Sequence, residues 1–274
     1  MLIKKNFRLY GNSPYHTILI HGGPGAAGSL APLAKKIALN FGVIEALQTE
    51  DSLQGQIKEL KNIIDTQATS PIILIGHSWG AMLGYLFCAY HPTYASKLIM
   101  ISSGSFEAKY ARNIESTILS RLTPEQKLDV NQLSLELKNN DRNNENAFQE
   151  LGRIFEIADT FDPTHFDTLE NFPGQYEIYQ KVWPEVAKLR ETSELLSLGK
   201  NITCPVTAIH GDYDSHPYQG VKEPLSPILQ NLSFHLLEKC GHQPWIERHT
   251  QEAFFQLINK EIYQALTPEI KLQR

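Results

Sequence analysis

The pentapeptide Gly-His-Ser-Trp-Gly at residues 76–80 constrains the fold of this chain more than any other stretch. It follows an apolar run at residues 71–75, typical of a buried strand, and precedes an apolar run at residues 81–90, typical of a helix. Side chains at the two glycine positions of such a turn would strike the neighbouring backbone. The turn presents the Ser78 hydroxyl to open space, which indicates a nucleophile. A glycine-rich turn with an incidental serine is the alternative.

The composition suits one large α/β domain. The chain has 274 residues, of which 42% are hydrophobic, so it can form a sizeable core. The chain has a net charge of −5, which does not suit a nucleic-acid binder, since such a protein needs a basic face. The N-terminus has no signal-peptide pattern, and no apolar run approaches the about 20 residues of a membrane span. We therefore expect a cytoplasmic protein whose partners are neither nucleic acid nor membrane.

Signatures of cofactors and metals are absent from the sequence. It contains no phosphate-binding Gly-x-x-x-x-Gly-Lys-Ser/Thr loop, no His-Glu-x-x-His and no paired Cys-x-x-Cys. The three cysteines, Cys88, Cys204 and Cys240, are an odd number in a chain that is not short, so a disulfide framework is not expected. We expect no cofactor, no metal site and no disulfide.

Strands and helices are expected to alternate in the first 104 residues and again from residue 204. Residues 105–200 between them are more polar and predict mainly helices. The strands are expected at residues 15–20, 42–47, 71–75, 97–101, 204–210 and 233–237. The helices are expected at residues 30–40, 81–90, 115–122, 124–137, 145–158, 176–196 and 225–232, with one more from about 52 and a last one from about 246.

This alternation predicts an α/β fold, with a mostly parallel twisted sheet and helices on both faces. Ligands of such sheets bind outside the carboxyl ends of the strands. Four notable segments each follow a predicted strand: residues 21–25, 76–80, 211–214 and 241–242. We expect all four to meet at one edge of the sheet, and this convergence is a stronger argument than any single motif.

A nucleophilic serine needs a base, and the base needs an acidic partner. After Ser78, an acid-then-histidine order is met by the segment at residues 211–214 and by His242, which we expect to be the base. The acid is Asp214 or Asp212; Asp214, which lies further past the strand, is favoured, and Asp212 would then orient the loop. His216 is expected near this site.

Attack on a carbonyl creates an oxyanion that needs fixed N–H donors. One donor is expected to be the backbone N–H of Trp79, directly after the serine. The segment His-Gly-Gly-Pro-Gly at residues 21–25 suits the other, because its glycines allow close backbone approach, and Gly23 is the favoured donor. Pro24 has no N–H and would stiffen the loop. A plain Gly-Pro turn is the alternative.

These motifs together resemble the α/β-hydrolase superfamily over the whole chain. The resemblance implies a nucleophile–base–acid triad of Ser78, His242 and Asp214, a core of residues 1–104 and 201–274, and an inserted helical cap of residues 105–200. HGGPG with GxSWG also resembles the proline iminopeptidase branch, although residues 45–51 do not match the Asp-Gln-Arg-Gly segment of that branch. That branch holds the substrate amine with acidic cap residues, for which the candidates by location are Glu156, Asp159, Asp162, Asp167 and Glu177.

The leading hypothesis is a serine hydrolase that acts on a small ester or amide through an acyl-enzyme. An aminopeptidase that releases an N-terminal residue, with a short peptide as substrate, is the first alternative. A ligand-binding sensor on the same fold is the second. Aminoacyl-naphthylamides and aryl esters separate the first two hypotheses, and multiple turnover separates both from the third.

Overall fold

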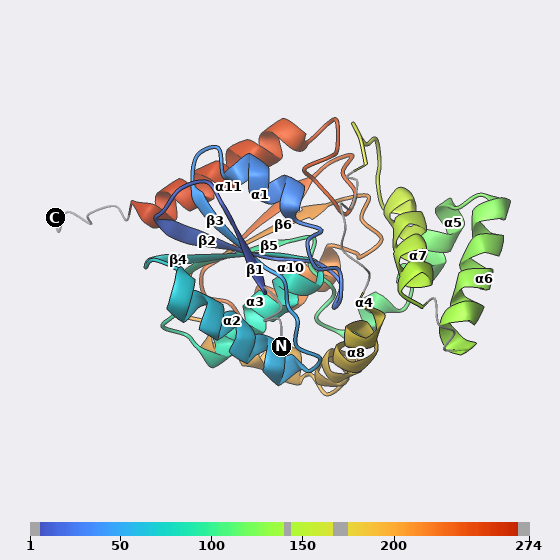
Figure 1. Cartoon of the computed structure of the whole chain (residues 1–274), viewed down its shortest axis with the longest axis horizontal. Helices are drawn as coiled ribbons and strands as arrows, with labels where there is room; N and C mark the ends of the chain where they lie inside the picture. The colour runs from blue at the N-terminus through green and yellow to red at the C-terminus, as the bar shows by residue number, and fades with distance from the viewer. Residues whose placement is uncertain (1–5, 140–143, 167–174, 268–274) are drawn as a thin grey trace, which may run out of the picture.

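A seven-stranded sheet forms the centre of the computed structural model, which describes residues 6–139, 144–166 and 175–267 (Figure 1). The strand order is β1-β3-β2-β4-β5-β6-β7. Strand β1 runs antiparallel to β3, and the other neighbouring pairs are parallel, as the sequence predicts. The bounds are β1 Phe7–Tyr10, β2 Tyr15–Ile20, β3 Gly42–Ala46, β4 Ile72–His77, β5 Ala95–Ile101, β6 Val206–Gly211 and β7 Leu232–Leu237.

The central strands are buried on both faces, which explains their continuous apolar sequences. Helices α1 (Ala31–Ile37) and α11 (Gln251–Leu266) cover one face of the sheet (Figure 1). Helices α2 (Leu53–Gln67), α3 (Trp79–Tyr90) and α10 (Gln219–Leu225) cover the other. The two apolar layers clamp the sheet, so the loops at its edge start from rigid positions.

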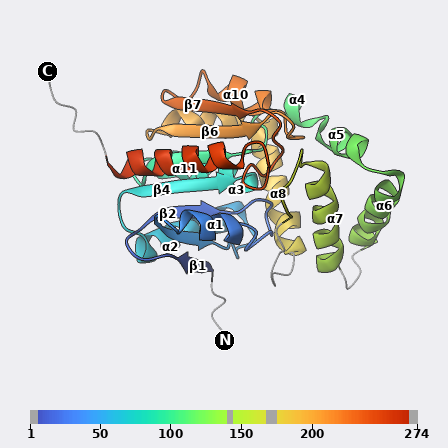
Figure 2. The same ribbon diagram turned by 90° about the horizontal axis from the view of Figure 1, so that it is seen from above.

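Helices follow one another between β5 and β6. They are α4 (Ala108–Ala111), α5 (Ile114–Arg121), α6 (Pro124–Asn139), α7 (Asn144–Ala158), α8 (Tyr176–Glu191) and α9 (Glu194–Leu198), with the 3₁₀ turn η1 (Gly199–Asn201) after them. Helices α5, α6 and α7 share a small apolar cluster of their own beyond the end of the sheet (Figure 2). Helix α8 instead joins the main core through Ile178, Val182 and Val186.

Three helices differ from the sequence-based expectation. The helix expected over residues 176–196 is interrupted at Ser193, which has a left-handed φ of 62°. The helix expected over residues 225–232 was wrong: α10 ends at Leu225, and Pro227 lacks the N–H that a continuing helix needs. The last helix begins at Gln251 rather than near residue 246.

No helix within the described ranges combines the length and the apolar character needed to cross a lipid bilayer. The longest ones, α6, α8 and α11, span 16 residues each, and polar side chains interrupt all three.

Glu247 occupies the turn that replaces the expected start of the last helix, and its side chain is fully buried. One carboxylate oxygen accepts hydrogen bonds from the N–H groups of Gly241 (2.7 Å) and Phe161 (2.8 Å). The other accepts from the N–H of Asp162 (2.8 Å). A single side chain therefore ties the loop after β7 to the chain that leaves α7.

Replacing Glu247 with alanine is expected to destabilise the protein strongly. Each buried N–H left without a partner costs roughly 1–3 kcal/mol, so we expect a loss of roughly 3 kcal/mol or more for Glu247→Ala. Urea denaturation followed by circular dichroism measures the free energy of unfolding. Glu252→Ala, an exposed change in the first turn of α11, is the control. Equal free energies of unfolding for the two variants would contradict this role of Glu247.

Candidate active site

The turn between β4 and α3 holds Ser78 in a strained backbone conformation, with φ 54° and ψ −115°. A Cβ added at Gly76 would collide with the carbonyl oxygen of Gly80, and one added at Gly80 would collide with that of Ile20. Both glycines are thus required by close backbone contacts, in agreement with the steric argument from the sequence. The side chain of Ser78 lines a cavity at the carboxyl edge of the sheet.

Trp79 stabilises this turn through hydrogen bonds that the sequence did not indicate. Its buried indole N–H donates to the side-chain oxygens of Gln48 (2.9 Å) and Gln56 (3.2 Å). Gln48 is itself buried with a left-handed φ of 48°, and its amide donates to the carbonyl of His21 (3.4 Å). Gln48 therefore connects the serine turn to the glycine-rich loop after β2.

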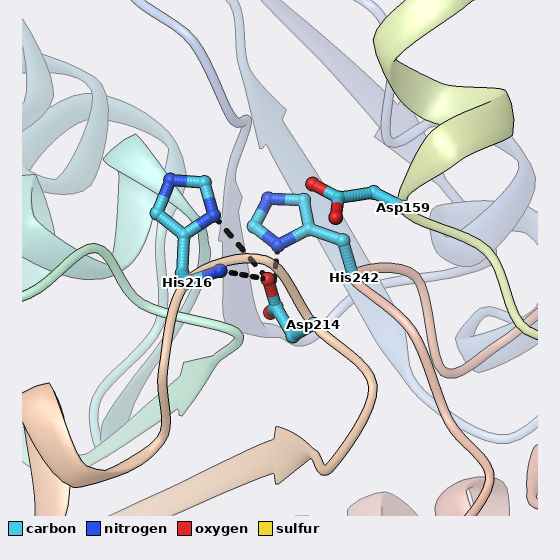
Figure 3. Close-up of side chains that lie close together, drawn as sticks. All are labelled: Asp159, Asp214, His216 and His242. Carbon is cyan, nitrogen blue, oxygen red and sulfur yellow. Dashed lines mark hydrogen bonds and ion pairs between the residues drawn. The ribbon is translucent and has the colours of Figure 1, made fainter. Parts of the chain in front are cut away.

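The loops after β6 and β7 bring Asp214 and His242 together (Figure 3). Nδ1 of His242 lies 2.8 Å from Oδ2 of Asp214, whose side chain is fully buried. Asp212, the alternative acid, points elsewhere and accepts a hydrogen bond from the N–H of Cys240 (3.2 Å). Of the two aspartates, Asp214 therefore contacts His242, whereas Asp212 stabilises the backbone of the loop.

Opposing effects set the charges of this pair. Burial lowers the pKa of His242, but the negative charge and the hydrogen bond of Asp214 outweigh it and raise that pKa to about 9. Burial alone would raise the pKa of Asp214. The neighbouring His242 and His210 and the hydrogen bonds from His216 and His242 hold it well below its usual range. The pair is therefore arranged to stabilise an imidazolium beside a carboxylate.

His216 contacts both Asp214 and His242, whereas the sequence suggested only that it lies near this site. Its backbone N–H donates to Oδ1 of Asp214 (2.8 Å), and its ring Nδ1 lies 3.3 Å from the same oxygen. The ring stacks on that of His242, with centroids 4.8 Å apart and planes 23° from parallel (Figure 3). His216 thus fixes both the carboxylate and one face of the base, and only its position two residues after Asp214 could have indicated this.

Two further histidines surround the pair as neutral donors. Burial and the positive charge that His242 can carry lower the pKa of His77 to about 3, so Nε2 of the neutral ring donates to the carbonyl of His242 (2.9 Å). Burial also lowers the pKa of His210, and its Nε2 donates to the carbonyl of His216 (2.8 Å). These bonds hold the backbone of the two loops that carry His216 and His242.

Asp159, directly after α7, reaches the same two loops (Figure 3). Its carboxylate accepts hydrogen bonds from the N–H (2.9 Å) and the hydroxyl (2.7 Å) of Ser215, and it forms an ion pair with Arg121 (3.2 Å). Its backbone carbonyl accepts from the N–H of His242 (2.8 Å). Asp159 is therefore engaged in holding the loops in place.

The same residues have the donor types of a cation site. One ligand atom each of Asp159, Asp214, His216 and His242 lies within 4.8 Å of the others. However, both carboxylates already accept hydrogen bonds from Ser215, His216 and His242. The group is therefore better described as a hydrogen-bonded network than as a set of metal ligands.

A cavity of about 330 Å³ lies over these residues. Gly22, Gly23, Ser78, His216 and His242 form its inner side, and side chains of α5 and α7 form the outer side. A Cβ at Gly22 would lie 3.2 Å from Cβ of Ser78, and Gly23 has a left-handed φ of 49°. The glycines thus allow the loop after β2 to run directly beside the serine.

The acidic residues considered for amine binding lie in different places. Glu156 and Asp159 line the cavity. Asp162 forms an ion pair with Arg248 (3.2 Å), and Glu177 lies in the first turn of α8, where it does not line the cavity. Asp167 lies outside the described residues. Of the described acidic residues in this group, Glu156 and Asp159 are therefore the two that line the cavity, and the carboxylate of Asp159 holds Ser215 and Arg121.

No family model matches the chain. It is 22% identical to a proline iminopeptidase of Lactobacillus crispatus, over 88% of this chain and 89% of that protein. It is 25% identical to a proline iminopeptidase of Heyndrickxia coagulans, over 86% of each. Among solved structures, VinJ superposes with a TM-score of 0.69 and 18% identity over 94% of both chains. A putative lipase from Acinetobacter baumannii does so with a TM-score of 0.66 and 18% identity, over 94% of this chain and 88% of that one.

The fold and these relatives together place the chain in the α/β-hydrolase superfamily, near its proline iminopeptidase branch. They confirm the fold class and the expectation of a hydrolase.

The protonation of His242 tests the electrostatics of this site. We expect its pKa near 9 in the native protein and at 6.5 or below in Asp214→Asn, because burial then dominates. NMR titration of the histidine ring signals measures both values. Asp212→Asn is the matched control and is expected to leave the pKa of His242 near 9. Equal shifts in the two variants would contradict the assignment of the pair.

Proposed function

We propose that this protein is a serine hydrolase of small ester or amide substrates, with Ser78 as nucleophile, His242 as base and Asp214 as its acidic partner. One observation carries the proposal. His242 forms a 2.8 Å hydrogen bond to the buried Asp214 and lines the same cavity as Ser78, whose backbone is strained in the way that exposes a hydroxyl. Nucleophile, base and orienting acid are the three parts that acyl transfer by a serine needs.

The reaction proceeds in two halves. With His242 in its neutral form, the Ser78 oxygen attacks the substrate carbonyl and His242 takes the hydroxyl proton, while the backbone N–H groups of Gly23 and Trp79 stabilise the oxyanion. The intermediate collapses to an acyl-enzyme as His242 protonates the departing alcohol or amine. A water molecule, deprotonated by His242, then attacks the acyl group, and Ser78 leaves with that proton. Asp214 stabilises the imidazolium in both halves and fixes the histidine tautomer.

In the same proposal, residues 105–200 act as a cap on a core formed by residues 1–104 and 201–274. Helices α5 and α7 supply the outer side of the cavity, whereas Ser78 and His242 come from the sheet edge. Covering the reacting groups excludes water and strengthens the electrostatic interactions among them. Substrate choice is therefore assigned to the cap and chemistry to the core.

The variant Ser78→Ala tests the nucleophile. We expect kcat for aryl acetates to fall by roughly 10³-fold or more, because removing one triad member abolishes acyl-enzyme formation. Circular dichroism checks that the variant folds. Ser120→Ala, an exposed change on α5, is the control, and it should retain both turnover and labelling by a fluorophosphonate. Turnover by Ser78→Ala within a few-fold of the native rate would overturn the proposed mechanism.

Aminopeptidase activity is the second candidate function. It is favoured by the proline iminopeptidases among the relatives and by one feature of the cavity. Glu156 lines the cavity on α7, one helical turn before Asp159, and its negative charge is felt at His242. A carboxylate in this place suits the protonated amine of an N-terminal residue, which must lie close to the scissile carbonyl.

Charge removal at Glu156 separates the two candidates. If the protein is an aminopeptidase, Glu156→Gln is expected to raise KM for prolyl-naphthylamide by roughly tenfold, because a charge-assisted hydrogen bond contributes about 1.5–3 kcal/mol. KM for an uncharged aryl ester should change little. Glu145→Gln, an exposed change in the first turn of the same helix, is the control.

The kinetics of the native protein with both substrates complete this comparison. Ester cleavage without cleavage of any aminoacyl amide removes the peptidase candidate and keeps the esterase. Multiple turnover of either substrate removes the ligand-sensor alternative.

A further inference from the structure

Helix α7 crosses the cavity with one continuous face. Phe148, Gly152, Phe155 and Asp159 all line it, and they follow one another at intervals of three or four residues. Such intervals place side chains in a row along a helix. Asp159 marks the end of the row beside His242 (Figure 3), and Gly152 lies seven residues earlier, which is about 10 Å along a helix axis.

Gly152 is unusual in this row because nothing in the backbone or the packing calls for glycine. It lies inside a helix, where glycine is less favourable than alanine. Apart from its chain neighbours and the nearby backbone of its own helix, a Cβ added to it would meet no atom of residues 6–139, 144–166 or 175–267 within 4 Å. This differs from Gly76 and Gly80, where a Cβ would collide with a carbonyl oxygen. Gly152 is exposed and lines the cavity, so a side chain at position 152 would extend into open space at the cavity wall.

The neighbours of that space are apolar and held in place. Phe148, one turn before Gly152, packs against Tyr176 (ring centroids 5.4 Å apart) and Tyr179 (5.1 Å) of α8. Phe155, one turn after Gly152, also packs against the apolar cluster of α5, α6 and α7. Ile118 of that cluster lines the cavity as well. The missing side chain thus leaves a slot with an aromatic ring at each end and the helix backbone as its base.

We propose that Gly152 is a specificity-determining residue, whose missing side chain leaves a slot between Phe148 and Phe155 for an apolar group of the substrate. The slot begins about two helical turns before Asp159, which lies beside His242, so it takes a substituent that extends away from the scissile carbonyl along α7. Short substrates do not reach it. The inference rests on the proposed serine hydrolase function and adds to it a preference for substrates with one extended apolar group.

Two ester series test the slot, because the apolar group can belong to either side of the scissile bond. In the first series the acyl group grows from acetyl to octanoyl on p-nitrophenol. In the second, the alcohol of acetate esters grows from methyl to naphthyl. The variants are Gly152→Ala and Gly152→Leu, and Glu145→Leu is the control that adds the same side chain to an exposed position of α7. The readout is kcat/KM for each ester relative to the smallest ester of its series.

In Gly152→Leu, we expect kcat/KM for the longest ester of at least one series to fall about tenfold or more relative to the smallest, the range that small steric changes in a pocket produce. Gly152→Ala should show the same trend more weakly, with an unchanged or higher Tm because alanine favours the helix. The reaction with a small fluorophosphonate should be equal in all variants, since that reagent does not extend to the slot.

The outcomes separate this inference from the function on which it rests. If the native protein hydrolyses the esters and both Gly152 variants keep the native length profile, the slot is wrong and the hydrolase proposal stands. If the native protein hydrolyses neither series and is not labelled by the fluorophosphonate, the proposed function fails and the slot fails with it. A length-dependent loss in the Gly152 variants, absent from Glu145→Leu, supports the slot.

Discussion

The buried carboxylate of Glu247 is the constraint on which the arrangement of this site depends. A carboxylate with no exposed surface must find its hydrogen bonds inside the protein, and this one takes them from Gly241, Phe161 and Asp162. Those three N–H groups belong to segments about 80 residues apart in the chain. Satisfying one side chain therefore fixes where the chain leaving α7 passes the loop that carries His242.

Four histidine rings surround a single aspartate at this site: two contact its carboxylate from the cavity side and two lie behind them. Asp214 carries the negative charge, and His242 and His216 contact its two oxygens from the cavity side. His77 and His210, both held neutral by burial, brace the loop backbone behind these rings. Of the imidazoles of His242, His77 and His210, only that of His242 has a raised pKa, because the charge and the hydrogen bond of Asp214 outweigh burial there. Burial makes the surrounding rings into fixed donors that do not compete for its proton.

The parts of this protein that could be predicted from sequence are those with a local signature. The apolar strands, the order of the elements and the steric need for Gly76 and Gly80 all follow from short stretches. Gln48, Asp159 and Glu247 had no such signature, because each acts through partners far away in the chain. The misplaced start of the last helix has a similar origin: residues 246–250 contain no glycine or proline that would prevent a helix, but the contacts of Glu247 hold them in a turn.

Asp159 links the helical segment between β5 and β6 to the loops at the sheet edge, so these two parts of the molecule are not independent of each other. The carbonyl of Asp159 holds the loop of His242, its carboxylate holds the loop of Asp214 through Ser215, and the residue directly follows helix α7, which lines the cavity. In a fully modular design, the segment between β5 and β6 could diverge freely while the sheet edge stayed constant. Here the two share a structural residue, so changes in the cavity lining on α5 and α7 have to leave Asp159 in place, and a transplanted segment would have to bring an equivalent carboxylate with it.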